Sequence, residues 1–370
     1  MKILFLVGSL RAGGLERRLI ELLSYLKLKG SYEMLLVISY NKIEYPKFHT
    51  LGIDYVDLGK KEGEKSFKIM KLVYSIARDF KPDLIHAWGA PEAFYSVFAS
   101  RILGIPLINN QIADIFGSKN LSLFSKFVNK INFTFSDVIC ANSYGGLKAY
   151  KQDKKKKSVV IYNGLDKNRF INLADKKVIR EKYGIKTEYV VIMAATYSVN
   201  KDWNRFFEIA KYVTTLRKDI TFISVGAEAD GKIYKQMLEL SERHQNILIK
   251  GRCSEVENLV NACDVGVLFS TRGEGVSNTI LEYLALGKPV IVDKEGGSAE
   301  FIKDGENGFF TEGKSVEQIG DLVINLIDDS VLRNKMGNMG KQTIEDLFTL
   351  DKMGEKFVNI YTKLIEKNIL

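Results

Sequence analysis

The sequence predicts an α/β protein with two doubly wound parallel sheets, one in each half of the chain. Short runs rich in Val, Ile and Leu alternate with stretches whose apolar residues recur at helical spacing, and this alternation is typical of a parallel sheet covered on both faces. A turn-forming pair, Asn163-Gly164, separates two such patterns. The length of 370 residues and the apolar content of 46% suit two ordinary domains. We expect domains at 1–164 and 165–348, and a final helix at 349–370.

The first half is expected to contain six buried strands. The apolar stretch 3–7 is too short for a signal peptide because Gly8-Ser9 interrupts it, so it is interpreted as the first strand. The strands are expected at 3–7, 34–39, 84–87, 106–109, 138–140 and 159–161. The helices between them are expected at 15–29, 65–79, 92–103 and 144–150.

The second half repeats the pattern with five expected strands. They lie at 189–194, 220–225, 247–249, 265–269 and 290–292, with helices between them. Three further helical patterns close the chain, at 315–328, 331–346 and 350–367. In the last of these, apolar residues recur at helical spacing and give the helix one face for packing.

The composition narrows the class of protein. No apolar run reaches the length that spans a membrane. Three scattered cysteines form neither a metal-binding spacing nor a disulfide framework, which fits a reducing cytoplasm. The net charge is +9, but residues 1–165 carry 25 Lys and Arg against 14 Asp and Glu, a net of +11, so the remainder is −2. This asymmetry predicts an anionic partner for the first half, such as a membrane surface, a nucleic acid or an acidic glycan.

The most distinctive segment runs from Glu274 to Glu282. A strand precedes it, and the helix that follows begins with small and polar residues at Ser277, Asn278 and Thr279. Unpaired N–H groups and the positive end of the helix dipole make such a helix start a phosphate site. Two glutamates eight positions apart flank that site, where they can accept hydrogen bonds from the hydroxyls of a sugar nucleotide. An ordinary N-cap is the alternative interpretation for the Ser277 region.

Four segments in order resemble one family, the retaining glycosyltransferases of family 4, which have the two-Rossmann GT-B architecture. The resemblance covers nearly the whole chain and is carried by Gly13-Gly14-Leu15-Glu16-Arg17, Ile161 to Asp166, Glu274 to Glu282, and Asp293 to Phe310. It implies a nucleotide-sugar donor linked to UDP or GDP, no cofactor and no metal. It also implies retention at the anomeric carbon without a protein nucleophile, and a last helix that crosses back onto the first domain.

The resemblance assigns roles around the donor. Glu274 would contact and orient the donor sugar, and Glu282 would bind the ribose hydroxyls. The backbone of the donor-binding loop would meet the distal phosphate, and this loop comprises Gly275, Val276, Ser277, Asn278 and Thr279. A carboxylate pair could also serve a glycosidase, but the glycine loops and paired sheets favour a nucleotide.

Lys201 matches the family lysine that neutralises the diphosphate. The family often has an arginine five residues earlier, where this chain has Thr196. Arg205 or Arg272 could substitute for it, and the sequence does not choose between them. Gly226 follows a strand and could line the nucleotide, and Arg252 could lie near the base, as could Asn258.

The first half offers three further candidates. Gly13 and Gly14 would let the backbone approach donor and acceptor closely, although a plain tight turn explains them as well. His86 ends an expected strand and is the third catalytic candidate with Glu274 and Lys201. Family members often carry two histidines here, one of which contacts the sugar, whereas this chain has His86 and Trp88. A core role for His86 stays open.

The acceptor is the least constrained partner. Residues 117–135 place apolar residues at helical spacing with lysines between them, and 151–157 adds a lysine block. Basic amphipathic helices lie on anionic membranes, although a core-facing helix with a solvated lysine edge is the alternative. We expect a cytoplasmic enzyme, peripheral on the inner face of the membrane, that moves a hexose-type sugar to a lipid-linked or polysaccharide acceptor of the cell envelope.

Two other functions fit the sequence less well. Nucleotide-sugar epimerases share the architecture, but they rely on additional acids and histidines, and only three histidines occur in this chain. A basic nucleic-acid-binding protein would have aromatic residues interleaved with the basic stretch, and 151–157 contains none. No nucleic-acid partner is therefore expected.

Overall fold

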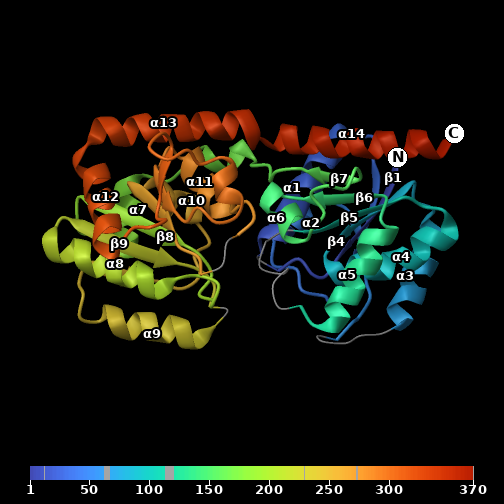
Figure 1. Cartoon of the computed structure of the whole chain (residues 1–370), viewed down its shortest axis with the longest axis horizontal. Helices are drawn as coiled ribbons and strands as arrows, with labels where there is room; N and C mark the ends of the chain where they lie inside the picture. The colour runs from blue at the N-terminus through green and yellow to red at the C-terminus, as the bar shows by residue number, and fades with distance from the viewer. Residues whose placement is uncertain (12, 62–66, 113–120, 229, 272–273, 370) are drawn as a thin grey trace. The chain divides into compact units, whose positions relative to one another are not determined.

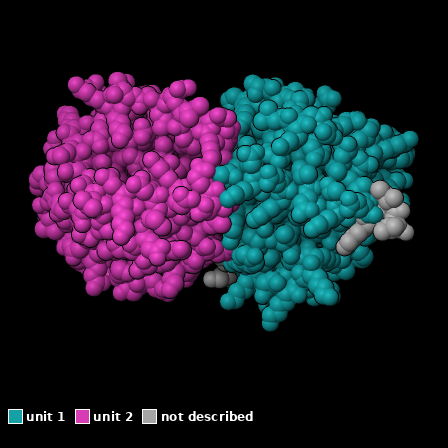
Figure 2. Space-filling view, turned by 90° about the horizontal axis from the view of Figure 1, so that it is seen from above, with its two compact units in different colours: residues 1–164, 349–370 teal, residues 165–348 magenta. Residues whose placement is uncertain are grey.

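A computed structural model places most of the chain in two compact units (Figures 1 and 2). Unit 1 comprises Met1–Gly164 and Thr349–Leu370, and unit 2 comprises Leu165–Phe348. The structure describes residues 1–11, 13–61, 67–112, 121–228, 230–271 and 274–369.

Unit 1 contains a seven-stranded sheet in the order β3-β2-β1-β4-β5-β6-β7, and every paired strand is parallel to its neighbour. The strands are β1 (Lys2–Val7), β2 (Glu33–Ile38), β3 (Asp54–Asp57), β4 (Leu84–Trp88), β5 (Leu107–Ile112), β6 (Val138–Ala141) and β7 (Ser158–Val160). The order reverses between β1 and β4, as in a doubly wound sheet.

Helices cover both faces of this sheet. They are α1 (Gly14–Lys29), α2 (Pro46–Thr50), α3 (Phe67–Phe80), α4 (Ala90–Leu103), α5 (Leu123–Phe135), α6 (Tyr144–Ala149) and α14 (Leu350–Ile369). Alternate residues of β1 enter different clusters: Phe5 packs with residues of α1 and α14, whereas Leu4 packs with residues of α3 and α4. Because both faces of the sheet are buried, the central strands are nearly continuous apolar runs in the sequence.

Helix α14 belongs to unit 1 although it ends the chain. Met353, Phe357 and Tyr361 are buried in the cluster that includes α1. A Cβ atom built on Gly354 would lie 2.3 Å from the ring of Tyr25, so only glycine allows α14 to approach α1 this closely. The packing face expected from helical spacing is therefore the face that α14 buries.

Unit 2 contains a six-stranded sheet in the order β10-β9-β8-β11-β12-β13, again with parallel pairs. The strands are β8 (Tyr189–Ala194), β9 (Ile220–Val225), β10 (Ile247–Ile249), β11 (Val265–Leu268), β12 (Val290–Val292) and β13 (Gly308–Phe310). The α-helices are α7 (Lys176–Tyr183), α8 (Trp203–Leu216), α9 (Gly231–Ser241), α10 (Val256–Asn261), α11 (Asn278–Ala285), α12 (Val316–Asp328) and α13 (Ser330–Leu347). The 3₁₀ turns are η2 (Lys167–Phe170) and η3 (Gly297–Glu300). Two parallel doubly wound sheets confirm the predicted fold class.

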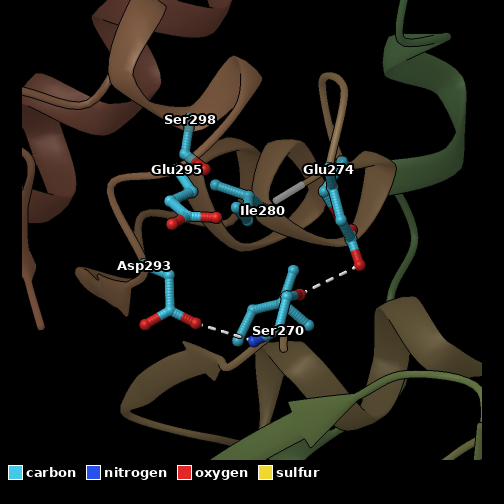
Figure 3. A pocket seen from close by; sticks show the side chains of 8 residues that line it. Ser270, Glu274, Ile280, Asp293, Glu295 and Ser298 are labelled. Atoms are coloured by element: carbon cyan, nitrogen blue, oxygen red, sulfur yellow. Dashed lines mark hydrogen bonds between the residues drawn. The ribbon is translucent and has the colours of Figure 1, made fainter. Parts of the chain in front are cut away.

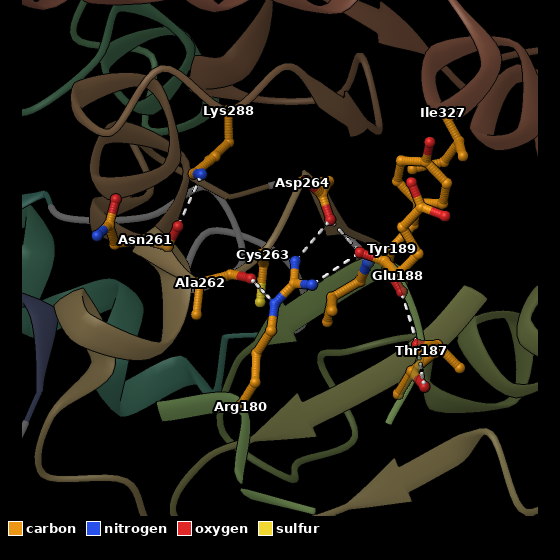
Figure 4. Close-up of polar contacts among 12 residues, drawn as sticks. Arg180, Thr187, Glu188, Tyr189, Asn261, Ala262, Cys263, Asp264, Lys288 and Ile327 are labelled. Atoms are coloured by element: carbon orange, nitrogen blue, oxygen red, sulfur yellow. Dashed lines mark hydrogen bonds and ion pairs between the residues drawn. The ribbon is translucent and has the colours of Figure 1, made fainter. Parts of the chain in front are cut away.

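A polar cluster joins α7 to the sheet of unit 2 (Figure 4). Arg180 pairs with Asp264 at 3.1 Å and donates to the carbonyl of Ala262 at 2.8 Å. Asp264 also accepts a hydrogen bond from the backbone N–H of Val190 at 2.8 Å. Nearby, burial lowers the pKa of Lys288 to about 8, and its ammonium donates to the carbonyl of Asn261. These bonds satisfy polar groups that the packing would otherwise leave buried and unpaired.

The structure can be compared with the sequence for the cysteines, for membrane-spanning helices and for the edge strands. Cys140, Cys253 and Cys263 are all free thiols. Across the described residues, no helix is both long and apolar enough to span a bilayer. Two edge strands were not predicted: β3 has mostly exposed side chains, and β13 has only three residues, so neither shows a buried apolar run.

Candidate functional site

Helix α11 begins at the edge of the unit 2 sheet where the strands end. Its N-cap is Ser277, which makes no side-chain cap hydrogen bond. The Thr279 hydroxyl donates to the carbonyl of Ala194, the last residue of β8, at 3.0 Å. The ring of Tyr283 lies over Gly266 of β11, where a Cβ atom would stand 2.3 Å from it. These contacts hold the N-terminus of α11, which favours anions, at the carboxyl ends of β8 and β11.

A glycine pair fixes the loop before α11. Gly296 forms a parallel bridge with Glu274, and the Gly297 N–H donates to the Glu274 carbonyl at 2.7 Å. A Cβ atom on Gly296 would lie 1.9 Å from that carbonyl oxygen, and one on Gly297 would lie 2.6 Å from the carbonyl carbon of Gly275. Gly296 also has a φ of +91°. Glycine is therefore needed at both positions for the two loops to meet.

Glu274 and Lys201 form an ion pair at this loop. The hydroxyl of Ser270 donates to the same carboxylate at 3.0 Å, and Lys201 and Ser270 form an antiparallel bridge. Burial lowers the pKa of Lys201 to about 7, while the carboxylate of Asp293 acts in the opposite direction. The cation and carboxylate expected at the donor are thus brought together within one unit.

A pocket lies between this loop and the ends of the neighbouring strands (Figure 3). Its lining is rich in carboxylates and hydroxyls and comprises Leu268, Ser270, Glu274, Ser277, Ile280, Asp293, Glu295 and Ser298. An adjoining space of about 640 Å³ shares Ser270, Asp293 and Glu295 with it and also contacts Arg205. Carboxylates and hydroxyls are suited to accept and donate hydrogen bonds to sugar hydroxyls.

Asp293 binds three groups at this pocket, although its sequence context did not mark it as a site residue. Its carboxylate accepts hydrogen bonds from the Ser270 N–H at 2.7 Å and from the Thr311 hydroxyl. It also pairs with Arg205 at 2.9 Å. Of the two cations considered as substitutes at Thr196, Arg205 is placed beside the pocket, whereas Arg272 lies outside the described residues. The sequence feature that could have predicted Asp293 is its position directly after the strand β12, at the edge of the sheet where the site lies.

Glu282 is buried within α11 and has a cationic partner. Its carboxylate pairs with Arg169 of η2 at 2.6 Å, and Arg169 also contacts Glu257. Burial lowers the pKa of Arg169, but the two carboxylates outweigh burial and raise it overall. The Nη1 atom of Arg169 is buried without a hydrogen-bond partner. The predicted ribose-binding carboxylate is therefore held by a residue that the sequence analysis missed.

The other residues suggested for donor binding differ in their burial and contacts. A Cβ atom on Gly226 would lie 1.7 Å from the Ala195 carbonyl, so strand packing alone requires this glycine. Asn258 accepts a hydrogen bond from the Ala174 N–H at 3.0 Å. Thr196 and Arg252 are exposed. Within the described part of the chain, no three His, Cys, Asp or Glu residues are grouped so that they could hold a metal ion.

In unit 1, the glycine loop forms the start of α1. Gly13 is the N-cap, and its carbonyl accepts a hydrogen bond from the Tyr45 hydroxyl at 2.8 Å. A Cβ atom on Gly13 would lie 2.2 Å from the Glu16 carboxylate. Burial raises the pKa of Glu16, while a hydrogen bond to its own backbone opposes this effect. Gly14 is exposed and Gly13 partly exposed, so this loop lies at the surface of unit 1.

His86 lies in the core of unit 1 and has no exposed surface. Its Nδ1 atom is 2.8 Å from the Tyr361 hydroxyl, and its ring packs against Phe5 and Trp88. Burial, followed by the charge of Arg18, lowers its pKa well below the ordinary value. These contacts match the core role that the sequence left open, and they leave His86 no exposed surface for the catalytic role. Trp88 is equally buried.

Comparison with known families matches both halves of the chain. Residues 12–169 match the model described as Glycosyltransferase Family 4, and residues 175–343 match Glycosyl transferases group 1. The structure of Anabaena Alr3699/HepE in complex with UDP and glucose superimposes with a TM-score of 0.85 at 22% identity, covering 98% of this chain and 99% of that one. At this identity the likeness supports the fold.

Two curated relatives cover most of the chain. An Escherichia coli UDP-Gal:alpha-D-GlcNAc-diphosphoundecaprenol alpha-1,3-galactosyltransferase is 25% identical over 323 residues, or 81% of this chain and 80% of its own length. A Campylobacter jejuni enzyme, described as N-acetylgalactosamine-N,N'-diacetylbacillosaminyl-diphospho-undecaprenol 4-alpha-N-acetylgalactosaminyltransferase, is 24% identical over 355 residues, or 90% and 92%. By name, both transfer a sugar to a diphosphoundecaprenol-linked acceptor.

Proposed function

The chain belongs to the group 1 glycosyl transferases of glycosyltransferase family 4, and from this membership we propose the transfer that it performs. It moves a hexose-type sugar from a UDP- or GDP-linked donor to a lipid-linked or polysaccharide acceptor, with retention at the anomeric carbon. The observation that carries the proposal is the start of α11, where a helix N-terminus and the Lys201–Glu274 pair adjoin one pocket.

The first task of the site is to stabilise the leaving diphosphate. The backbone N–H groups of Ser277, Asn278 and Thr279 bind the distal phosphate at the positive end of the α11 dipole. Lys201 supplies a full charge, and Arg205 supplies a second one from beside Asp293. Groups fixed in place before the reaction stabilise developing charge more than mobile ones do.

The second task is to hold the sugar. Glu274 accepts hydrogen bonds from donor sugar hydroxyls once Lys201 turns to the phosphate. Asp293 and Glu295 line the same pocket, so a sugar with its own carboxylate meets like charges there. A neutral, hydroxyl-rich hexose suits this lining. Glu282, held by Arg169, binds the ribose hydroxyls.

The third task is proton transfer. As the bond from the anomeric carbon to the phosphate oxygen breaks, the bond to the acceptor oxygen forms on the same face. The acceptor hydroxyl gives its proton to the departing phosphate oxygen, so no protein nucleophile is required. His86 takes no part, because it has no exposed surface.

The acceptor is proposed from the relatives and the charge of the chain. Two of the relatives, which match 81% and 90% of the chain, act on diphosphoundecaprenol-linked glycans by name. Residues 1–165 carry a net charge of +11, which favours an anionic, lipid-linked acceptor. We place the enzyme in cell-envelope glycan synthesis, peripheral on the cytoplasmic face of the membrane.

A thermal-shift screen against nucleotide sugars tests the donor assignment. A ligand at about 100 times its Kd stabilises the native state by about 2.7 kcal/mol, and we expect UDP- or GDP-hexoses to raise the Tm. Lys201→Met should remove the shift, whereas the exposed Lys235→Met should keep it. Equal shifts in both variants, or none with any nucleotide sugar, would reject the assigned pocket.

A further inference from the structure

Helix α5 buries polar side chains. Asn129 accepts a hydrogen bond from the Gln111 side-chain amide of β5 at 2.8 Å. Asn132 donates to the carbonyl of Ala90 at 2.8 Å and to Gln111 at 2.7 Å. Val128 is the apolar residue of α5 buried between them. The inner face of this helix (α5 in Figure 1) therefore includes an amide network, beside Val128 and the partly buried Phe133.

The outer face of α5 carries the large apolar residues instead. Leu123 is 84% exposed, Phe124 is 48% exposed and Phe127 is 55% exposed. A soluble surface helix normally has the opposite arrangement, with apolar residues facing the core. Grouped exposed aromatic and aliphatic side chains mark a surface that contacts something else. Phe124 and Phe127 thus lie outward, whereas Phe133 packs against the core of unit 1.

Lysines lie among these apolar residues. Lys126 and Lys130 are exposed on α5, and the helix contains no acidic residue. The partly buried Lys157 donates from its ammonium to the carbonyls of Thr134 and Ser136, which brings the end of the 154–157 lysine run to the C-terminal end of α5. The surface is therefore both apolar and strongly positive.

We propose that this surface, the α5 face, rests on an anionic lipid bilayer. We define the α5 face by Leu123, Phe124, Lys126, Phe127 and Lys130. The apolar side chains enter the headgroup region and the lysines pair with lipid phosphates, as in interfacial helices. A second copy of the chain is a poor occupant, because it would bring two sets of lysines together. The proposal stands on the contacts of α5 and adds to the proposed function a route to a lipid-linked acceptor.

Vesicle flotation of the full chain tests the charge requirement. We expect binding to vesicles of phosphatidylcholine with phosphatidylglycerol, little binding to phosphatidylcholine alone, and loss of binding at high salt. Lys126→Gln with Lys130→Gln should lower the partition coefficient about 30-fold, taking about fivefold per lysine. The matched double variant Lys235→Gln with Lys303→Gln, on exposed lysines of unit 2, should not change it. Equal binding to both vesicle types would overturn the proposal.

A second set of variants tests the apolar contact. Leu123→Ser with Phe127→Ser should abolish flotation, whereas Val178→Ser with Val331→Ser, also exposed, should not. Phe127→Trp should show a blue-shifted emission with anionic vesicles only. All variants should keep the thermal shift with nucleotide sugars, which separates this proposal from the donor assignment. A Trp emission that stays unshifted, or a dimer in solution that Leu123→Ser with Phe127→Ser dissociates, would contradict a bilayer as the occupant.

Discussion

At the scale of single residues, the fold sets the charge of Lys201. Burial lowers the pKa of this ammonium from 10.5 to about 7, against the opposing effect of Asp293. The unfolded chain therefore binds this proton more tightly than the folded chain does between those two pH values. Stability is reduced below pH 7, and the penalty disappears as the pH rises toward 10.5. In the proposed site, this cost would be offset when the ammonium pairs with the donor diphosphate.

Donor binding should weaken as the pH rises above the pKa of Lys201. A bound diphosphate favours the charged ammonium and raises its pKa in the complex. Above pH 7, Lys201 of the free protein must take up a proton before the donor binds. The affinity for the donor should therefore fall by up to about tenfold per pH unit. Calorimetric titration with a nucleotide sugar between about pH 6 and about pH 8.5 measures this slope. Lys201→Met should bind weakly with no slope, and a pH-independent affinity in the unmutated protein would be inconsistent with the role.

Removing Glu282 should cost stability as well as donor binding. Arg169 is buried between Glu282 and Glu257, so Glu282→Ala leaves its charge only partly compensated. Losing one partner of a buried pair costs about 3 kcal/mol, measurable by urea unfolding. Glu282→Gln, which keeps the shape, should lose donor affinity at a smaller stability cost. Glu239→Ala, which breaks an exposed pair with Lys235, is the control, and an equal destabilisation there would contradict the argument.

Sequence reasoning found the residues that a local pattern marks and missed those that only the sheet brings together. Glu274 and the start of α11 are neighbours in sequence, so spacing alone predicts their proximity. Asp293 reaches Ser270 because β11 and β12 are adjacent strands, which no local pattern shows. The burial of His86 could not be predicted either, because it depends on His86 pairing with Phe5 across the sheet, which turns its side chain to the face that α1 and α14 cover.

At the scale of elements, the loop before α11 depends on the Gly296-Gly297 turn. Two loops that follow different strands meet here with their backbones in contact. These glycines belong to a segment that carries the family resemblance. The physical reason for glycine here is steric, because a side chain would occupy the space of the Glu274 carbonyl. The carboxylate proposed to contact the donor is therefore positioned by a turn more than twenty residues later in the chain.

Gly296→Ala should disable the donor site. The positive φ costs about 1–2 kcal/mol, and the added Cβ would also lie 1.9 Å from the Glu274 carbonyl oxygen. Gly313→Ala is the matched control, because its φ is +72° and no atom lies within 4 Å of its Cβ. We expect the control to lose stability alone and Gly296→Ala to lose nucleotide-sugar binding too, as read by thermal shift. Retained binding in Gly296→Ala would show that the loop has another support.

The sequence predicted most helices and central strands because their apolar runs are long. It missed β3, whose sequence Asp54-Tyr55-Val56-Asp57 has an exposed acid at each end, and β13, which has three residues. Helix α5 was expected with its apolar face turned either to a membrane or to the core, because helical spacing cannot tell an inner face from an outer one. The Asn129 and Asn132 bonds decide the orientation.

At the scale of the whole molecule, unit 1 is built from both ends of the chain. The buried residues of α14 complete the cluster that covers one face of its sheet. The family resemblance implied that the last helix returns to the first domain, and α14 lies in unit 1. The first 164 residues alone therefore lack a part of their own core.

A chain ending at Phe348 should lose the folded unit 1. Truncation removes Met353, Phe357 and Tyr361 and exposes the apolar surface that they cover. Fully burying one such side chain is worth about 1.5–3 kcal/mol, so the loss is comparable to the stability of a domain. Limited proteolysis should degrade unit 1 and leave residues 165–348. A chain ending at Glu366 keeps all three residues and should resist, and equal resistance of both truncations would contradict this dependence.

The return of α14 also has a consequence for biosynthesis. The ribosome delivers the helix that completes unit 1 only after all of unit 2 has emerged. Residues 165–348 form a contiguous stretch that can fold as soon as it leaves the exit tunnel. Residues 1–164 cannot complete their core until α14 has been synthesised, because one face of their sheet stays uncovered. During that interval the nascent chain exposes apolar surface that chaperones can bind. The amino-terminal half therefore completes its folding after the half that follows it.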